Sequence, residues 1–308
     1  MRALAFHKHI NNYFVKRRNI LSMKKSILEM KTLRKYKEYL YEEERSQATI
    51  TKYMRDVMQF YHYLPEGYKV ITKEVLVTYK NSLSDKYKIS SINSMLAALN
   101  GLLDFMKLSY LKLKLHKIQR SVFYEEEQEL TKNEYKRLLD CALRKGNKRL
   151  YMLMQTICGT GIRVSEHQYI TVESLKEGKA VVKNKGKIRI IFIPGKLKKM
   201  LKDYCRKENI IRGAVFITKS GNPMDRSNIW NAMKKLCREA KVSDKKVFPH
   251  NLRHLFALTY YRMQKDVVRL ADILGHASIE TTRTYTMTTG KECQKSLSKM
   301  NLVVPIYT

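Results

Sequence analysis

Five side chains in this sequence have the chemistry to grip a phosphodiester and attack its phosphorus. Arginine suits the first task because its planar guanidinium stays charged and donates two hydrogen bonds to phosphate oxygens. Tyrosine suits the second, provided that positive charge and a base help its phenol, whose ordinary pKa is about 10. The set predicts backbone cleavage that uses neither a metal ion nor an attacking water. Its members are Arg163, His250, Arg253, His276 and Tyr285.

The segment HNLRH places His250 and Arg253 three residues apart, directly after Pro249. A helix that begins near this proline puts both side chains on one face, with His250 in the positively polarised first turn. From there a histidine can donate to the phosphate, or hold the tyrosine and accept its proton. His254 lies one residue further round the helix, where a buried structural role outweighs a catalytic one.

The other candidates stand where a helix is expected to stop. His276 follows Gly275 in the segment LGH, and a histidine in such a turn can point its ring at a non-bridging oxygen. Arg163 follows the Gly-Thr-Gly segment at 159–161, which lets the backbone come close to a substrate. Tyr285 is one of 20 tyrosines, so only its position after LGH selects it.

In this order and at this spacing, the motifs resemble the signature of the tyrosine recombinase family, which includes phage-type integrases and Xer-like enzymes. They are GTGIRVSE with Arg163, HNLRH, LGH and Tyr285. The similarity extends over roughly residues 25–290, and the helical N-terminal part is similar to the family's core-binding domain. The resemblance implies a site-specific DNA recombinase that works through a 3′-phosphotyrosine intermediate. That bond stores the energy of the cut, so rejoining needs no ATP, and no cofactor is expected.

The resemblance also assigns roles. Arg163 and Arg253 clamp the scissile phosphate, and Tyr285 is the nucleophile. The family uses a lysine on a β-hairpin to protonate the leaving 5′ oxygen. Lys185 in the segment NKGK is the best match, and the neighbouring lysines two residues to either side, 183 and 187, are the alternatives.

Two residues beside Arg163 need a separate interpretation. Glu166, three residues later, either orients the active-site helix by hydrogen bonding or has a plain structural role. His167 stands where the family commonly has an apolar residue. This departure concerns only local packing.

The partners follow from the resemblance as well. They are double-stranded DNA with specific recombination sites, a homotetramer on two such sites, and accessory DNA-bending proteins. The biological role is that of a mobile-element integrase, a preference that rests on how common such enzymes are, or of an Xer-like resolvase or invertase. A type IB topoisomerase that nicks and closes DNA with the same residues is an alternative enzyme. A non-catalytic DNA-binding protein on this fold is a third interpretation.

Composition agrees with a nucleic-acid partner. The 308 residues carry a net charge of +33 and are 44% hydrophobic, enough for two domains with real cores. No stretch approaches the ~18 apolar residues of a spanning helix, and the N-terminus is not typical of a signal peptide, so no membrane is expected. The five cysteines form no metal or disulfide pattern. A cytoplasmic, nucleoid-associated setting fits best.

Hydrophobic periodicity predicts an all-helical first domain. A helix is expected over about 27–43, and Ser46 caps a second, which ends at Pro65. A third covers roughly 72–84, and an apolar stripe from Ile92 to Met106 indicates a fourth. Helices this amphipathic pack as a small bundle, so the stripes are core.

The second domain is expected to be mainly α with a small β-sheet. Thr131 and Glu134 predict a capping box at its first helix. The β-branched segment 180–194 predicts a hairpin with its turn near Lys185. Residues 131–286 hold 34 Lys and Arg against 13 Asp and Glu, whereas residues 22–115 hold 17 against 10. The more basic domain is therefore the one that contains the candidate site.

An acidic run at 125–129 marks either a solvated linker or an acid-rich helix start. We read it as a domain boundary. The apolar C-terminal tail is too short to fold alone, so it packs on a neighbouring protomer or in cis, or is disordered. The predicted parts are an N-terminal extension (1–21), a helical core-binding domain (22–115), a linker (116–130), a catalytic domain (131–290) and the tail (291–308).

Overall fold

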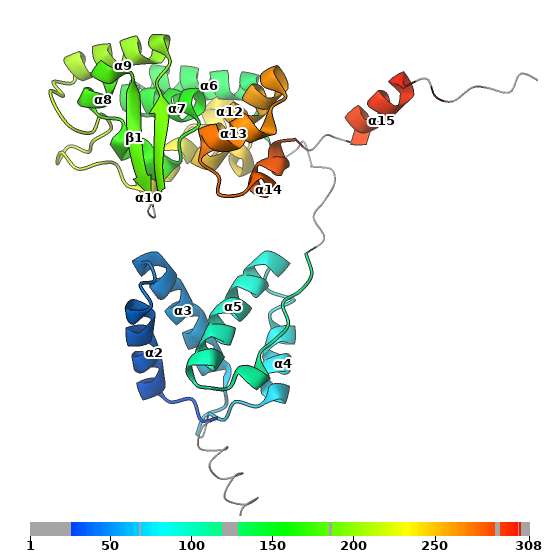
Figure 1. Ribbon diagram of the computed structural model, residues 1–308. Helices are drawn as coiled ribbons and strands as arrows, with labels where there is room; N and C mark the ends of the chain where they lie inside the picture. The colour runs from blue at the N-terminus through cyan, green and yellow to red at the C-terminus, as the bar shows by residue number, and fades with distance from the viewer. Residues whose placement is uncertain are drawn as a thin grey trace, which may run out of the picture. The chain divides into compact units, whose positions relative to one another are not determined.

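The computed structural model describes residues 26–67, 69–118, 129–184, 187–286, 290–300 and 302. The chain divides into two compact units, Met1–Arg120 and Ser121–Thr308 (Figure 1). Within the described residues both units are mostly helical, and one two-stranded sheet lies in the second. The predicted fold class, mainly α with a small sheet, is confirmed.

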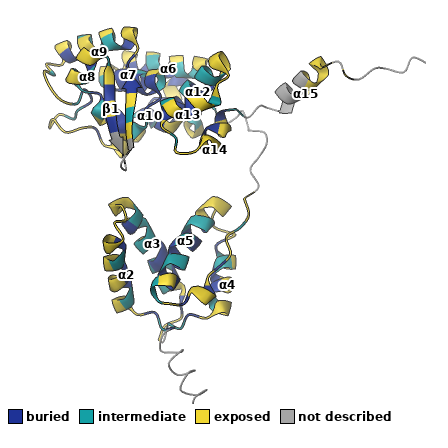
Figure 2. Cartoon of the chain, in the orientation of Figure 1, coloured by how far each residue is buried: buried dark blue, intermediate teal, exposed yellow. Residues whose placement is uncertain are grey.

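The first unit is a helical bundle whose apolar stripes face one another. Ser46 caps the second helix by accepting a hydrogen bond from the Thr49 amide at 3.4 Å, as predicted. The stripe of the fourth helix is buried, and Leu96, Leu102 and Leu103 are fully inaccessible (Figure 2). The helices are α2 (Met30–Glu42), α3 (Gln47–Tyr63), α4 (Lys73–Ser82), α5 (Ile89–Phe105) and the short η1 (Ser109–Leu111).

The second unit begins with the predicted capping box, in which the Thr131 side chain accepts from the Glu134 amide and the Glu134 carboxylate accepts from the Thr131 amide. Helix α12 has its proline at the first turn, as expected for Pro249. The elements are α6 (Lys132–Arg144), α7 (Lys148–Thr160), η3 (Val164–Tyr169), α8 (Val172–Glu177), β1 (Lys179–Asn184), β2 (Lys187–Phe192), α9 (Gly195–Lys207), α10 (Arg226–Lys234), α11 (Cys237–Ala240), η4 (Asp244–Lys246), α12 (Pro249–Gln264), α13 (Val267–Leu274), α14 (Ile279–Thr282), η5 (Arg283–Tyr285) and α15 (Gly290–Lys299).

Strands β1 and β2 pair antiparallel, with Val182 opposite Arg189 and Ala180 opposite Ile191. Because side chains alternate across a strand, these four residues share one face. Val182 and Ile191 are buried there, whereas Ile190 on the opposite face is half exposed. The hairpin therefore inserts one charged residue, Arg189, into the unit's interior. Lys185 and Gly186, the predicted turn, lie outside the described residues.

Two properties of the described residues bear on the sequence expectations. No helix there is long and apolar enough to cross a membrane. Four cysteines within the described ranges (141, 158, 205 and 237) are free thiols.

Candidate active site

The site begins where helix α7 ends. Gly161 terminates the helix in the left-handed region at φ 67°, and a Cβ added there would lie 2.4 Å from a ring atom of Phe256. Only glycine meets both conditions without strain. Gly159 and Thr160 remain within α7, so the break expected over three residues is confined to Gly161. The chain then turns to present Arg163.

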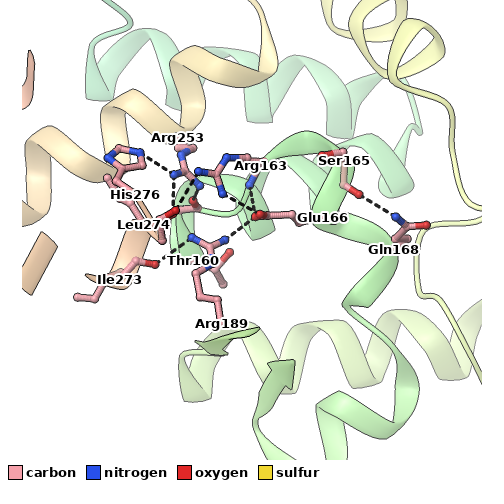
Figure 3. Close-up of polar contacts among 12 residues, drawn as sticks. Thr160, Arg163, Ser165, Glu166, Gln168, Arg189, Arg253, Ile273, Leu274 and His276 are labelled. Atoms are coloured by element: carbon pink, nitrogen blue, oxygen red, sulfur yellow. Dashed lines mark hydrogen bonds and ion pairs between the residues drawn. The ribbon is translucent and has the colours of Figure 1, made fainter. Parts of the chain in front are cut away.

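Arg253 is deeply buried, with 2% of its surface exposed. Its Nη1 donates to the Gly161 carbonyl and its Nη2 to the Leu274 carbonyl, both at 2.7 Å. Its Nη2 also lies 3.0 Å from His276 Nε2 (Figure 3). Backbone oxygens from two distant segments therefore fix the guanidinium in one orientation.

Arg163 is held differently, with 38% of its side chain exposed. Its Nη1 donates to Glu166 Oε1 at 2.9 Å, and its Nη2 donates to the Gly275 carbonyl at 3.2 Å. Its backbone amide donates to Glu166 Oε2 at 2.7 Å. Glu166, 2% exposed, thus orients this segment by hydrogen bonding, which was one of the two roles predicted for it.

Arg189 also belongs to this cluster, although the sequence motifs do not select it. It donates from Nη2 to Glu166 Oε2 and from Nη1 to the Ile273 carbonyl at 3.0 Å (Figure 3). The sequence signal that could have identified Arg189 is the alternation of inward-facing and outward-facing side chains along the hairpin. Counting back from the buried Ile191 puts Arg189 on the inner face, and a charge there needs a partner.

His276 joins the arginines to the tyrosine. Arg253 can only donate, so His276 Nε2 accepts, and the ring proton lies on Nδ1, which is 2.8 Å from Thr282 Oγ1. The His276 ring stacks on Tyr285, with centroids 6.2 Å apart and planes 17° apart. The His254 ring also packs against the phenol, with centroids 4.9 Å apart and planes 56° apart. Both histidines therefore fix the position of Tyr285.

Burial and positive charge set the proton affinities. Burial and, next, the nearby Arg253 charge together lower the pKa of His276 to about 4, so its ring is neutral at pH 7. The same two causes lower the pKa of His250. Burial raises the pKa of Tyr285, while Arg253 opposes this through its charge and a hydrogen bond. The phenol is protonated at neutral pH and needs a base in order to attack.

His250 faces a pocket of about 730 Å³ beside this cluster. Arg163 and Arg253 line the pocket together with His250, and Arg226 and Trp230 of α10 line it as well. Three guanidinium groups and an imidazole in one hollow make a receptor for an anion with several oxygens.

The structure thus brings together Arg163, His250, Arg253, His276 and Tyr285. Lys185 lies outside the described residues. His167 is buried and bonds the Val164 carbonyl within its own short helix, so it takes no part in the cluster. No group of three or more His, Cys, Asp or Glu that could hold a metal ion occurs among the described residues.

Each of the two units contains a match to a known protein-family model. Residues 128–292 match the profile described as "Phage integrase family", and residues 33–109 match "Phage integrase, N-terminal SAM-like domain". The chain is 29% identical over 290 residues to "Tyrosine recombinase XerA" of Pyrococcus furiosus, covering 91% of this chain and 98% of the relative. It is 27% identical to the XerA of Pyrococcus horikoshii, covering 92% and 98%.

A solved structure shares the fold. It is described as "Crystal structure of a lambda integrase tetramer bound to a Holliday junction". The TM-score is 0.68 at 18% identity, and the match covers 86% of this chain and 80% of that chain.

Proposed function

Because this chain belongs to the phage integrase family and is a tyrosine recombinase that cuts and rejoins DNA, we propose that the described cluster is its catalytic centre. The members are Arg163, His250, Arg253, His276 and Tyr285. The observation that carries the proposal is a connected set of contacts. Arg163 donates to the Gly275 carbonyl, Arg253 donates to the adjacent Leu274 carbonyl and contacts His276, and the His276 ring stacks on the Tyr285 ring.

Each group has a task in the proposed reaction. The Tyr285 oxygen attacks the scissile phosphorus, and the phosphorus–O5′ bond breaks. The products are a 3′-phosphotyrosine and a free 5′-hydroxyl. Arg163 and Arg253 stabilise the charge on the equatorial oxygens, a task for which fixed guanidinium groups are suited. His276 presents its ring beside the same phosphate.

Two proton transfers balance this step. His250, whose lowered pKa leaves it neutral and able to accept a proton at pH 7, takes the phenol proton. The leaving 5′ oxygen takes a proton from Lys185, in the segment between β1 and β2, with the neighbouring lysines 183 and 187 as the alternatives. Reversal of both transfers reseals the strand without ATP.

We further propose that both units contact duplex DNA at specific recombination sites, in the cytoplasm at the nucleoid. The parts are those predicted from the sequence, with 22–115 as core-binding domain and 131–290 as catalytic domain. Four protomers assemble on two sites, accessory DNA-bending proteins assist, and the tail 291–308 packs on a neighbouring protomer. The net charge of +33 favours such a polyanionic partner.

The biological context has two candidates. We propose either integration of a mobile element or an Xer-like reaction that resolves or inverts DNA. Similarity along nearly the whole chain to two proteins named XerA favours the Xer-like reaction. Integration into a new target and excision from paired sites in a plasmid assay distinguish the two.

The test of the catalytic proposal uses a nicked suicide DNA, from which the short 5′-hydroxyl fragment diffuses away after cleavage. Wild-type protein should accumulate a covalent protein–DNA adduct, and Tyr285→Phe should form none while it still binds. An adduct of undiminished yield in Tyr285→Phe would remove the nucleophile assignment. Relaxation of plasmids without a specific site would favour the topoisomerase alternative.

The single tryptophan offers a separate test of DNA binding. Trp230 is 45% exposed and lines the pocket beside His250. Duplex DNA should change its fluorescence, and affinity should fall by roughly 10³–10⁵ between 50 and 200 mM salt if 6–10 phosphates are contacted. A flat salt response would contradict recognition through the DNA backbone.

A further inference from the structure

Three different arginines converge on one helix terminus. The last carbonyl groups of a helix lack intrahelical partners and carry the negative end of its dipole, so they attract cations. At the end of α13, three successive carbonyl oxygens each accept a hydrogen bond from a different guanidinium. Figure 3 shows the bonds to Ile273 and Leu274. The pairs are Ile273 with Arg189 at 3.0 Å, Leu274 with Arg253 at 2.7 Å, and Gly275 with Arg163 at 3.2 Å.

Of these three, Arg189 is the one with no part in the proposed chemistry. Its side chain is 10% exposed, whereas that of Arg163 is 38% exposed, and it does not line the pocket beside His250. Placing a charge in the interior is costly unless specific partners compensate for lost hydration. The Glu166 carboxylate and the Ile273 carbonyl are these partners.

Both partners lead directly to residues of the catalytic centre. Glu166 holds Arg189 through Oε2 and Arg163 through Oε1, so one buried carboxylate sets the spacing of the two guanidinium groups. The Ile273 carbonyl lies three residues before His276. Arg189 is therefore connected to Arg163 through Glu166, and to the turn that contains His276 through the Ile273 carbonyl.

Packing strengthens the second connection. Gly275 has φ +61°, and a Cβ added there would lie 2.4 Å from Arg189 Cδ. The aliphatic part of Arg189 thus lies directly against the backbone of the LGH turn. We therefore expect a shift of this side chain to displace the Gly275 carbonyl, which also accepts a hydrogen bond from Arg163.

We propose that Arg189 is a positioning residue for DNA cleavage, because it ties strand β2, Glu166 and the end of α13 into one frame that holds Arg163 against the scissile phosphate. The inference rests on the proposed function. It assigns Arg189 to the clamp on the non-bridging oxygens and not to the leaving-group side, although the residue lies on the same hairpin as the lysine candidates.

Loss of Arg189 should leave the Arg163 guanidinium charged but displaced from the scissile phosphate. A displacement of about 1 Å in a positioned group costs roughly 100-fold in rate. Arg189→Met, which keeps an unbranched side chain and removes both hydrogen bonds, should lower the single-turnover cleavage rate by that amount. Arg189→Lys can satisfy one of the two acceptors and should lose roughly tenfold. DNA affinity should change less than about threefold, because many other phosphate contacts remain.

The experiment compares three suicide substrates, using the full chain. The first has a normal phosphodiester. The second has a methylphosphonate at the scissile position, whose missing oxygen charge lessens the need for the guanidinium clamp. The third has sulfur at the bridging 5′ position, and this leaving group departs without a proton. Arg206→Met, on the exposed side of α9, is the control for loss of one positive charge.

The inference predicts that Arg189→Met is slow on the phosphodiester and on the sulfur substrate, and within a few-fold of wild type on the methylphosphonate. Rescue by the sulfur substrate instead would overturn it, since Arg189 would then act on the leaving-group proton. Wild-type rates on all three substrates would also overturn it, provided that Tyr285→Phe is inactive. An inactive wild type or an active Tyr285→Phe would count against the proposed function itself.

A folding defect has its own control. Thermal unfolding followed by circular dichroism identifies it in Arg189→Met. If that variant does not fold, Arg189→Lys and Glu166→Gln carry the test with the same three substrates. Both should show the same selective recovery on the methylphosphonate, and its absence in both would contradict the inference.

Discussion

The two units each bury one carboxylate between two basic side chains, but they do so in opposite ways. Asp56 of the first unit is 4% exposed and pairs with Lys52 and Arg55 from its own helix. Glu166 of the second unit is 2% exposed and pairs with Arg163 and with Arg189, which comes from a strand 23 residues away. The ion pairs of the first cluster are local to one helix, although Lys52 also donates to the Ser94 carbonyl of α5 at 3.4 Å, whereas the ion pairs of the second join separate elements.

The solvent exposure of the partners indicates what each cluster does. Lys52 and Arg55 keep 34% and 71% of their side chains exposed, so water screens the pairs and their contribution to stability is modest. Arg189 is nearly enclosed, so its pairing with Glu166 is specific in geometry. We infer that the first cluster satisfies a buried charge on a surface helix, and that the second holds a reaction geometry.

The largest effect should come from removing one of the two arginines proposed to clamp the phosphate, of which Arg163 belongs to the second cluster. Arg163→Ala and Arg253→Ala should each lower the cleavage rate by roughly 10³–10⁵, as for other guanidinium groups that stabilise a transferring phosphoryl group. Site binding measured by gel shift should stay largely intact. Loss of binding with normal chemistry in a preassembled complex would contradict the clamp assignment.

The next largest effect should distinguish the two buried carboxylates, Glu166 and Asp56. Glu166→Gln should lower cleavage by roughly 100-fold, because Arg163 and Arg189 lose their shared anion. Asp56→Asn should leave the cleavage rate at saturating DNA unchanged, and should lower stability by about 1–2 kcal/mol. The measurements are single-turnover cleavage and urea unfolding of both variants. Equal losses of activity in both would end the distinction between the clusters.

A smaller effect should separate two glycines with similar backbone angles. Gly275 and Gly146 have φ of +61° and +66°, but only an added Cβ at Gly275 meets another atom within 4 Å. Alanine at 146 should cost about 1 kcal/mol from the left-handed backbone alone. Alanine at 275 should cost about 2–4 kcal/mol, because Arg189 must also move. Equal melting temperatures for the two variants would show that the arginine packing is unimportant.

The smallest effect should appear as a pH dependence of stability in the second unit. Burial lowers the pKa of His254 from 6.5 to about 4, despite Glu129 at 3.6 Å. The unfolded chain therefore binds more protons between pH 6.5 and 4, so stability falls as pH drops through this window. His254→Phe should remove about 1–2 kcal/mol of that loss. The check is the free energy of urea unfolding of wild type and His254→Phe at pH 7 and at pH 5. An equal drop in stability in both proteins would contradict the prediction.

The sequence predicted the local features well. Periodicity located helices such as α5, and cap residues such as Ser46 and Thr131 placed helix starts, because these depend on neighbours within one turn. The motifs also selected two arginines, two histidines and a tyrosine that lie in one cluster in the structure. Arg189 was missed because its partners lie in two other elements. No local pattern states that successive carbonyls of α13 would each bind a different arginine.

The most direct test of the account is to locate the phosphotyrosine itself. Wild-type protein is trapped on a nicked suicide substrate, digested with protease and nuclease, and analysed by mass spectrometry. We expect the nucleotide remnant to be attached to Tyr285, which packs against His254 and His276. Attachment to Tyr260 or Tyr261, or the absence of any tyrosine adduct in an active protein, would contradict it.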